Sequence, residues 1–180
     1  IYSVIILFFA LALIGFIFQD MINLFFRNFF DINLSQNILD YLNAIAAQIQ
    51  GMSRSELISF IISNNLKSTF FSIFLGTIFG ILPVLGTISN GYLLGFVSSI
   101  SVLGEGIDSL WKLLPHGIFE LPAVFISLGL GLKLGMFIFQ KNKLKSFKNC
   151  LINSLKVFLL IIVPLLIIAG IIEGILILAK

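Results

Sequence analysis

Apolar runs long enough to cross a lipid bilayer constrain this chain more than any other feature of its sequence. Spanning the hydrocarbon core takes about 20 residues of helix, and inside that core only helices and closed barrels satisfy every backbone hydrogen bond. Hydrophobic residues make up 59% of the 180 residues and charged residues only 11%, whereas a typical soluble domain is about 25% charged. The sequence therefore argues against a soluble domain and predicts an all-α fold, a polytopic helical transmembrane bundle.

The runs predict five spans within a single transmembrane domain that covers residues 1–180. Gln19 and Asp20 end the first span. The stretch Lys67–Leu103 is too long for one span and short for two, and the turn signal Ser89-Asn90-Gly91 predicts the break within it; a break at Pro83 is the alternative. The predicted spans are residues 1–18, 68–88, 91–103, 117–139 and 155–178.

Two short amphipathic helices are predicted between the first and second spans, over residues 35–50 and 54–64. Ser35 is the candidate N-cap of the first helix, whose apolar residues fall on one face. The run Ser53-Arg54-Ser55-Glu56 fits a capping box at the start of the second. Amphipathic helices between spans usually lie in the membrane interface or cover a bundle, so we expect both helices there.

A cluster of lysines without a single acid separates the last two spans. Cytoplasmic loops of membrane proteins carry the excess of Lys and Arg, so residues 140–154 are predicted to face the cytoplasm from the plasma membrane. Five spans then place the N-terminus inside, and residues 19–65 and Lys180 outside. The net charge of +3 comes from this cluster, which indicates topology rather than nucleic-acid binding. The lysines are Lys141, Lys143, Lys145 and Lys148.

Small residues recur at intervals of four in every predicted span after the first. Helices inside a bilayer associate where small residues allow close backbone approach, so the longest row, in the fourth span, predicts the central helix. Because five short spans enclose little interior, we expect these rows to support a homodimer; packing within one chain alone is the alternative. The row of the fourth span is Ala123, Ser127, Gly131 and Gly135, and the other predicted packing residues are Gly76, Gly80, Gly91, Gly95, Gly170 and Gly174.

The most informative stretch for function is residues 114–123, which contain the only histidine and two of the four prolines. On a helix His116 and Glu120 are one turn apart and share a face. Ionisable side chains are costly in hydrocarbon, so both should face protein or a water-filled cavity. Pro122 has no N–H to donate to the carbonyl of Ile118, which leaves a backbone acceptor beside Glu120. The predicted polar site contains His116, Glu120, Glu173 and Asn90, and the structural motif around it contains Pro115, Gly117, Pro122 and Ala123.

Three functions are weighed for this site. The first is a conduit or transporter for a cation, a proton or another small solute, with Glu120 as the charged ligand and His116 as a partner that titrates near neutral pH. The second is structural, with the two side chains locking one helix of a non-catalytic membrane scaffold. The third, an enzyme, is disfavoured because the sequence has no nucleophile motif and metal chemistry normally requires three protein ligands. We therefore predict no enzymatic activity, no metal and no cofactor.

The sequence resembles the stage II sporulation protein M family over roughly residues 66–178. The run Leu-Pro-His-Gly-Ile-Phe-Glu-Leu-Pro-Ala at 114–123 carries the resemblance, together with Gly-Leu-Lys-Leu-Gly at 131–135, Asn90-Gly91 and Gly95. The resemblance implies a polytopic, mainly helical membrane protein. It also implies envelope protein partners, because the named members act in a cell-envelope complex during engulfment, in which partner proteins cut peptidoglycan. It implies no reaction for the chain itself.

Overall fold

The computed structural model describes residues 1–78, 80–112 and 114–178; within these ranges the side chains of residues 112, 114–116 and 178 lie outside the description. The described residues form helices and contain no β-strand, which confirms the predicted all-α class. Among them, five helices are long and apolar enough to cross a membrane: Tyr2–Phe30, Arg54–Thr77, Ile81–Glu105, Gly117–Phe139 and Lys143–Ile177.

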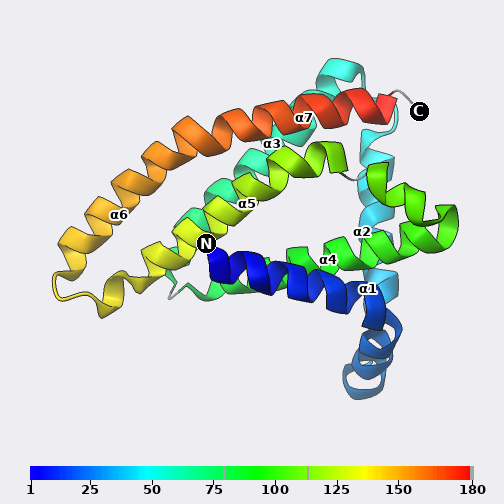
Figure 1. The fold of residues 1–180 in the computed structure, drawn as a ribbon, viewed down its shortest axis with the longest axis horizontal. Helices are drawn as coiled ribbons and strands as arrows, with labels where there is room; N and C mark the ends of the chain where they lie inside the picture. The colour runs from blue at the N-terminus through cyan, green and yellow to red at the C-terminus, as the bar shows by residue number, and fades with distance from the viewer. Residues whose placement is uncertain (79, 113, 179–180) are drawn as a thin grey trace.

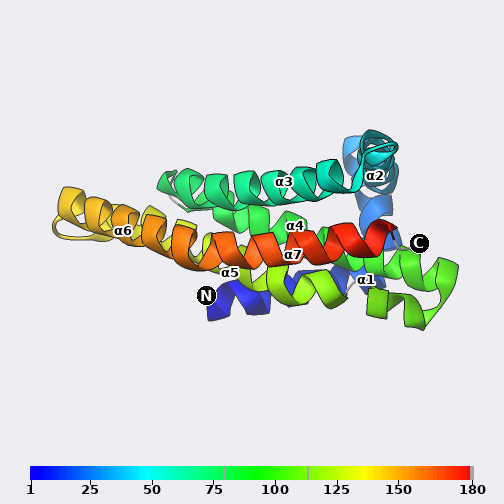
Figure 2. The same ribbon diagram turned by 90° about the horizontal axis from the view of Figure 1, so that it is seen from above.

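The central helix is α5 (Leu114–Gly135), which contributes to both hydrophobic cores. On one side it packs against α3 (Arg54–Phe74) and α7 (Val163–Leu178). On the other side lie α1 (Tyr2–Phe30) and α4 (Ile81–Glu105), which run side by side in the same direction (Figure 1). Figure 2 shows α3 on one side of the bundle and the first part of α1 on the other.

The break between the second and third candidate spans lies earlier than the favoured prediction. Helix α3 ends at Phe74, a 3₁₀ turn covers Leu75–Thr77 (η1), and Gly80 takes a left-handed backbone with φ 71° before α4 begins. The predicted break at Ser89-Asn90-Gly91 is therefore wrong, because these residues lie inside α4. The alternative was close: Pro83 lies in the first turn of α4, where a missing N–H costs no helical hydrogen bond.

The second predicted amphipathic helix is the first part of a candidate span. Its capping box is present: the Ser53 amide donates to Glu56 Oε2 at 2.8 Å, and the Glu56 amide donates to Ser53 Oγ at 3.4 Å. The helix does not end at residue 64, however, but continues as α3 to Phe74, because Leu66, Phe70 and Ile73 pack onto the core formed with α5 and α7.

The first helix is also longer than predicted. Helix α1 passes Gln19 and Asp20 and ends at Phe30, with a kink at Phe18 after which its last part turns away from the direction of its first part (Figure 1). Helix α2 (Leu34–Ile49) follows and matches the predicted helix 35–50 within a residue. Its N-cap is Asn33, not Ser35: Asn33 Oδ1 accepts from the amide of Gln36 at 3.1 Å.

The lysine cluster lies at the same end of the bundle as Ile1 and the α3–α4 connection, whereas α2 and the end of α7 lie at the opposite end (Figure 1). A 3₁₀ turn over Met136–Phe139 (η3) ends the α5 span. The predicted loop 140–154 is wrong from Lys143 onward, because α6 (Lys143–Val157) is helical and continues through a π turn at Phe158–Ile162 (η4) into α7. Lysine and leucine are good helix formers, so this segment has no local reason to unwind.

Candidate functional site

Glu120 lines a cavity of about 520 Å³ between α1, α4, α5 and the 3₁₀ helix Ile107–Lys112 (η2). Asn90 of α4 lines the same cavity, so the structure brings these two predicted site residues together. Gly117 and Ile118, one turn before Glu120, also belong to the lining. The rest of the wall is apolar apart from Ser98: Phe8, Phe9, Leu93, Leu94, Val97, Leu110, Leu121 and Val124.

Glu120 has a second carboxylate as its electrostatic neighbour. Its charge interacts with that of Glu173 on α7, and both side chains are half-buried. Like charges repel more strongly in a low-dielectric interior than in water, so a cation or a proton beside the pair would relieve the repulsion. Glu173 does not line the cavity itself, so it influences the site from the α5–α7 contact.

The remaining residues of the predicted motif lie in different places: some line the cavity, some lie in the core, and the side chains of others are outside the description. The side chains of His116 and Pro115 lie outside the described residues, and the place of His116 in the site stays a prediction. Pro122 is inside α5 and exposed, and Ile118, whose carbonyl lacks the Pro122 donor, lines the cavity. Ala123 is fully buried in the core with Ile162 and Leu166, so its role is packing.

The predicted packing residues meet other helices of the same chain. A Cβ added to Gly91 would lie 2.6 Å from the carbonyl oxygen of Phe8, and one on Gly95 would clash with the Ala12 carbonyl. Gly76 and Gly80 approach Gly131 and Gly135 at the α3–α4 connection. Gly170 and Gly174 of α7 approach Ile62 and Ile58 of α3. Ser127 is fully buried, and its hydroxyl donates to the Val124 carbonyl at 2.8 Å. Contacts within one chain therefore occupy these rows.

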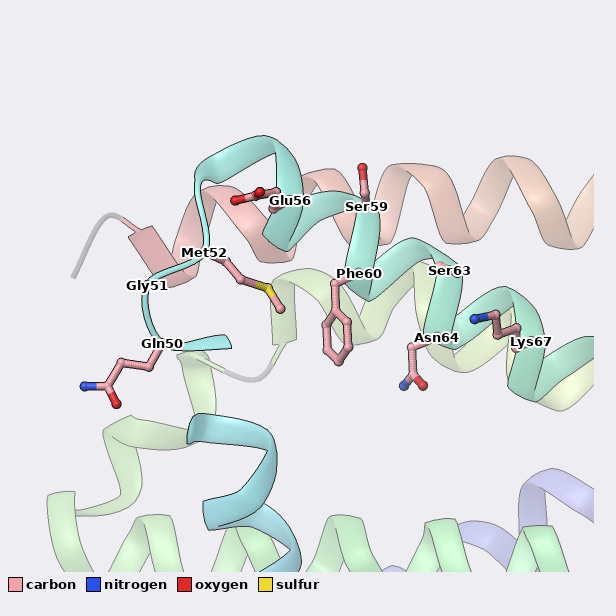
Figure 3. Close-up of a pocket in the computed structure, with 9 residues that line it drawn as sticks. All are labelled: Gln50, Gly51, Met52, Glu56, Ser59, Phe60, Ser63, Asn64 and Lys67. Carbon is pink, nitrogen blue, oxygen red and sulfur yellow. The ribbon is translucent and has the colours of Figure 1, made fainter. Parts of the chain in front are cut away.

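A polar face on α3 was not predicted from the sequence. Glu56, Ser59, Ser63 and Lys67 follow one another at intervals of three and four, so they form one stripe along the helix. All four side chains are exposed, and Lys67 lies roughly midway between Arg54 and Thr77, the ends of this candidate span. They line a depression of about 690 Å³, into which Phe60 and Asn64 also project (Figure 3). The spacing was visible, but its meaning depends on α3 crossing the membrane.

Comparison of the sequence with known protein families identifies one match. The profile of the family described as stage II sporulation protein M matches residues 4–176. The chain belongs to this family. The stage II sporulation protein M match includes α1 and α2, and so extends beyond the residues 66–178 that carry the resemblance.

One curated relative of this stage II sporulation protein M family member is an uncharacterized protein of Methanocaldococcus jannaschii. The two are 33% identical over 119 residues, which cover 63% of this chain and 66% of the relative. The match thus spans slightly less than two thirds of the relative's length. No solved structure matches the chain.

Proposed function

We propose that this protein is a non-enzymatic membrane conduit or transporter for a small cation or proton, with Glu120 as the charged group of its site. The observation that carries the proposal is that Glu120 and Asn90 line one cavity inside the candidate spans while Glu173 lies close enough to interact with Glu120. An ionisable residue within a membrane span is a functional-site hypothesis by default, because hydrocarbon penalises it.

The chemistry of the carboxylates favours a cation or a proton as the transported species. Carboxylate and amide oxygens accept hydrogen bonds or coordinate cations, and the Glu120–Glu173 pair adds negative potential on the same side. The protein would lie in the plasma membrane with Lys141–Lys148 on the cytoplasmic side. The cavity would then be in the outer half of the bilayer, since α5 begins at the end opposite to the lysines (Figure 1).

The test is flux through the protein reconstituted into liposomes. An imposed cation or proton gradient should dissipate faster than in protein-free liposomes, and Glu120→Gln should reduce the rate roughly tenfold or more, because it removes the charged ligand. Asp31→Asn is the matched control: Asp31 is exposed outside the cavity with φ 56°, a conformation that Asn adopts readily. Equal flux in wild type and Glu120→Gln, with both proteins folded, would contradict the proposal.

A non-catalytic scaffold is the second candidate, and the exposed polar face of α3 favours it. A lysine facing lipid at the centre of a span costs about 2.5–3.5 kcal/mol, so the stripe that ends at Lys67 gains from a polar cover. A second copy of the chain could supply it, because hydroxyl and amide side chains such as Ser63 and Asn64 hydrogen-bond between membrane helices. Envelope proteins, as the family resemblance implies, would be other partners.

Cross-linking tests the scaffold. In a Cys150→Ser background, Ser63→Cys should form a disulfide-linked dimer in reconstituted membranes if α3 faces a second copy. Leu85→Cys is the control, because Leu85 is half exposed on α4 in an apolar setting that suits lipid. Equal cross-linking of both variants would indicate random collision and remove the support for a dimer across α3.

A further inference from the structure

A second polar pocket lies between α5 and α6, at the lysine-rich end of the bundle and away from the Glu120 cavity. Its volume is about 270 Å³. Leu130 and Lys133 of α5 form one wall, and α6 forms the other with Ser146, Asn149, Cys150, Asn153 and Ser154.

The lining is rich in hydrogen-bond donors and contains no carboxylate. The Lys133 ammonium offers three N–H donors and a full positive charge, each asparagine amide offers two donors, and each serine hydroxyl offers one. An adjoining depression of about 630 Å³ shares Ser146 and Asn149 and adds Lys141 and Lys145. The electrostatics of this end therefore favour an anion with several oxygen acceptors.

Ser154 gives an independent indication of a missing acceptor. It is fully buried, and its hydroxyl has no hydrogen-bond partner. Serine and threonine in helices commonly donate to the carbonyl four residues earlier, as Thr87 and Ser89 do in α4 at 2.8 and 2.9 Å. A buried hydroxyl left unpaired is destabilising, and an anion held in the pocket that Ser154 lines would remove this cost.

The pocket lies at the end of the apolar spans, which is the depth at which lipid headgroups lie in a membrane. The uninterrupted apolar run of the last candidate span begins at Val157, directly after the exposed Lys156, and the pocket residues of α6 lie just before it. Lys133 lies on α5 at the same level, since both helices line the pocket. Basic pockets between transmembrane helices at this depth suit phosphate-bearing lipid headgroups.

We propose that the pocket between α5 and α6 binds a phosphate-type anion, supplied by the headgroup of an anionic phospholipid in the leaflet at the lysine-rich end. Lys133 provides the charge, while Asn149, Asn153 and Ser154 orient the phosphate oxygens. Free inorganic phosphate has the same chemistry and is the alternative source.

Cys150 provides a native readout, because it lines the pocket and is the only cysteine in the chain. The rate at which N-ethylmaleimide modifies Cys150 is measured by mass spectrometry on the purified protein in an uncharged detergent. Short-chain phosphatidylglycerol should slow the modification saturably, whereas sodium chloride at matched ionic strength should not. Inorganic phosphate forms the second arm.

Two charge variants on the two pocket helices separate site binding from general attraction. Lys133→Gln should raise the concentration for half-protection roughly tenfold, as expected for the loss of a charge-assisted hydrogen bond. Lys148→Gln removes an exposed charge of α6 that does not line the pocket, and should leave that concentration unchanged. Ser154→Ala should weaken protection several-fold without unfolding, because the phosphate would lose the hydrogen bond that the Ser154 hydroxyl donates.

Each outcome either distinguishes the lipid headgroup from inorganic phosphate as the ligand or argues against an anion site between α5 and α6. Protection by phosphatidylglycerol alone, or by both ligands, supports the lipid headgroup. Protection by inorganic phosphate alone keeps the anion site and rejects lipid as its source. The proposal is overturned if neither ligand protects Cys150, if sodium chloride protects equally, or if Lys148→Gln weakens protection as much as Lys133→Gln.

Discussion

At the scale of single residues, the contact between α1 and α4 depends on the absence of a side chain at Gly95. A Cβ there would meet the carbonyl of Ala12 and the amide of Phe16, which are backbone atoms that cannot rotate away. Overpacking of this kind typically costs about 1–3 kcal/mol. We therefore expect Gly95→Ala to lower the free energy of unfolding by at least that range, measured by denaturation in detergent.

Gly104 provides the matched control on the same helix. A Cβ at Gly104 meets nothing within 4 Å, so Gly104→Ala should be neutral or stabilising by up to about 1 kcal/mol, because alanine favours a helix over glycine. If the two substitutions changed stability equally, the close approach of α1 and α4 would be wrong.

Residue chemistry predicted part of the site. The cost of a carboxylate in an apolar run identified Glu120, and the structure places Glu120 in a cavity. Asn90 was predicted at a turn, yet it lies inside α4 and its amide donates to the carbonyl of Gly86 at 2.8 Å. The two residues line one cavity only because α4 packs beside α5, and such a long-range arrangement cannot be derived from spacing along the chain.

At the scale of elements, local hydrogen bonds were predictable and helix lengths were not. The capping box of α3 could be identified because Ser53 and Glu56 are three residues apart. The length of α3 was misjudged because Ser63, Asn64 and Lys67 resemble the polar end of an interfacial helix. The break after α3 depends instead on the close approach of Gly76 to Gly131, which is a tertiary contact.

The start of α3 gives a prediction at this scale. Ser53→Ala removes the N-cap oxygen that accepts from the Glu56 amide, and should lower the free energy of unfolding by about 1 kcal/mol. Ser59→Ala, on the exposed face of the same helix, should change it by less than about 0.5 kcal/mol. Thermal unfolding in detergent measures both. An equal loss in the two variants would argue against the cap at Ser53.

At the scale of the whole molecule, the arrangement of the ends gives a topology that labelling can test. In a Cys150→Ser background, a membrane-impermeant thiol reagent should modify Gln48→Cys in intact cells, because α2 lies at the end opposite the lysine cluster, which the proposed orientation puts outside. Lys143→Cys, at the lysine-rich end, should react only after the membrane is opened. Labelling of Lys143→Cys in intact cells would show that the protein has the opposite orientation in the membrane.

Water access to Glu120 is the central claim about the whole molecule, since a conduit needs a path to this carboxylate. The direct measurement is modification of Glu120→Cys, in a Cys150→Ser background, by a small charged thiol reagent added on the α2 side of reconstituted vesicles. Leu128→Cys, two turns deeper on α5 and buried, is the control. The account predicts rapid modification at position 120 and almost none at 128; absence of modification at position 120 in the folded protein would contradict it.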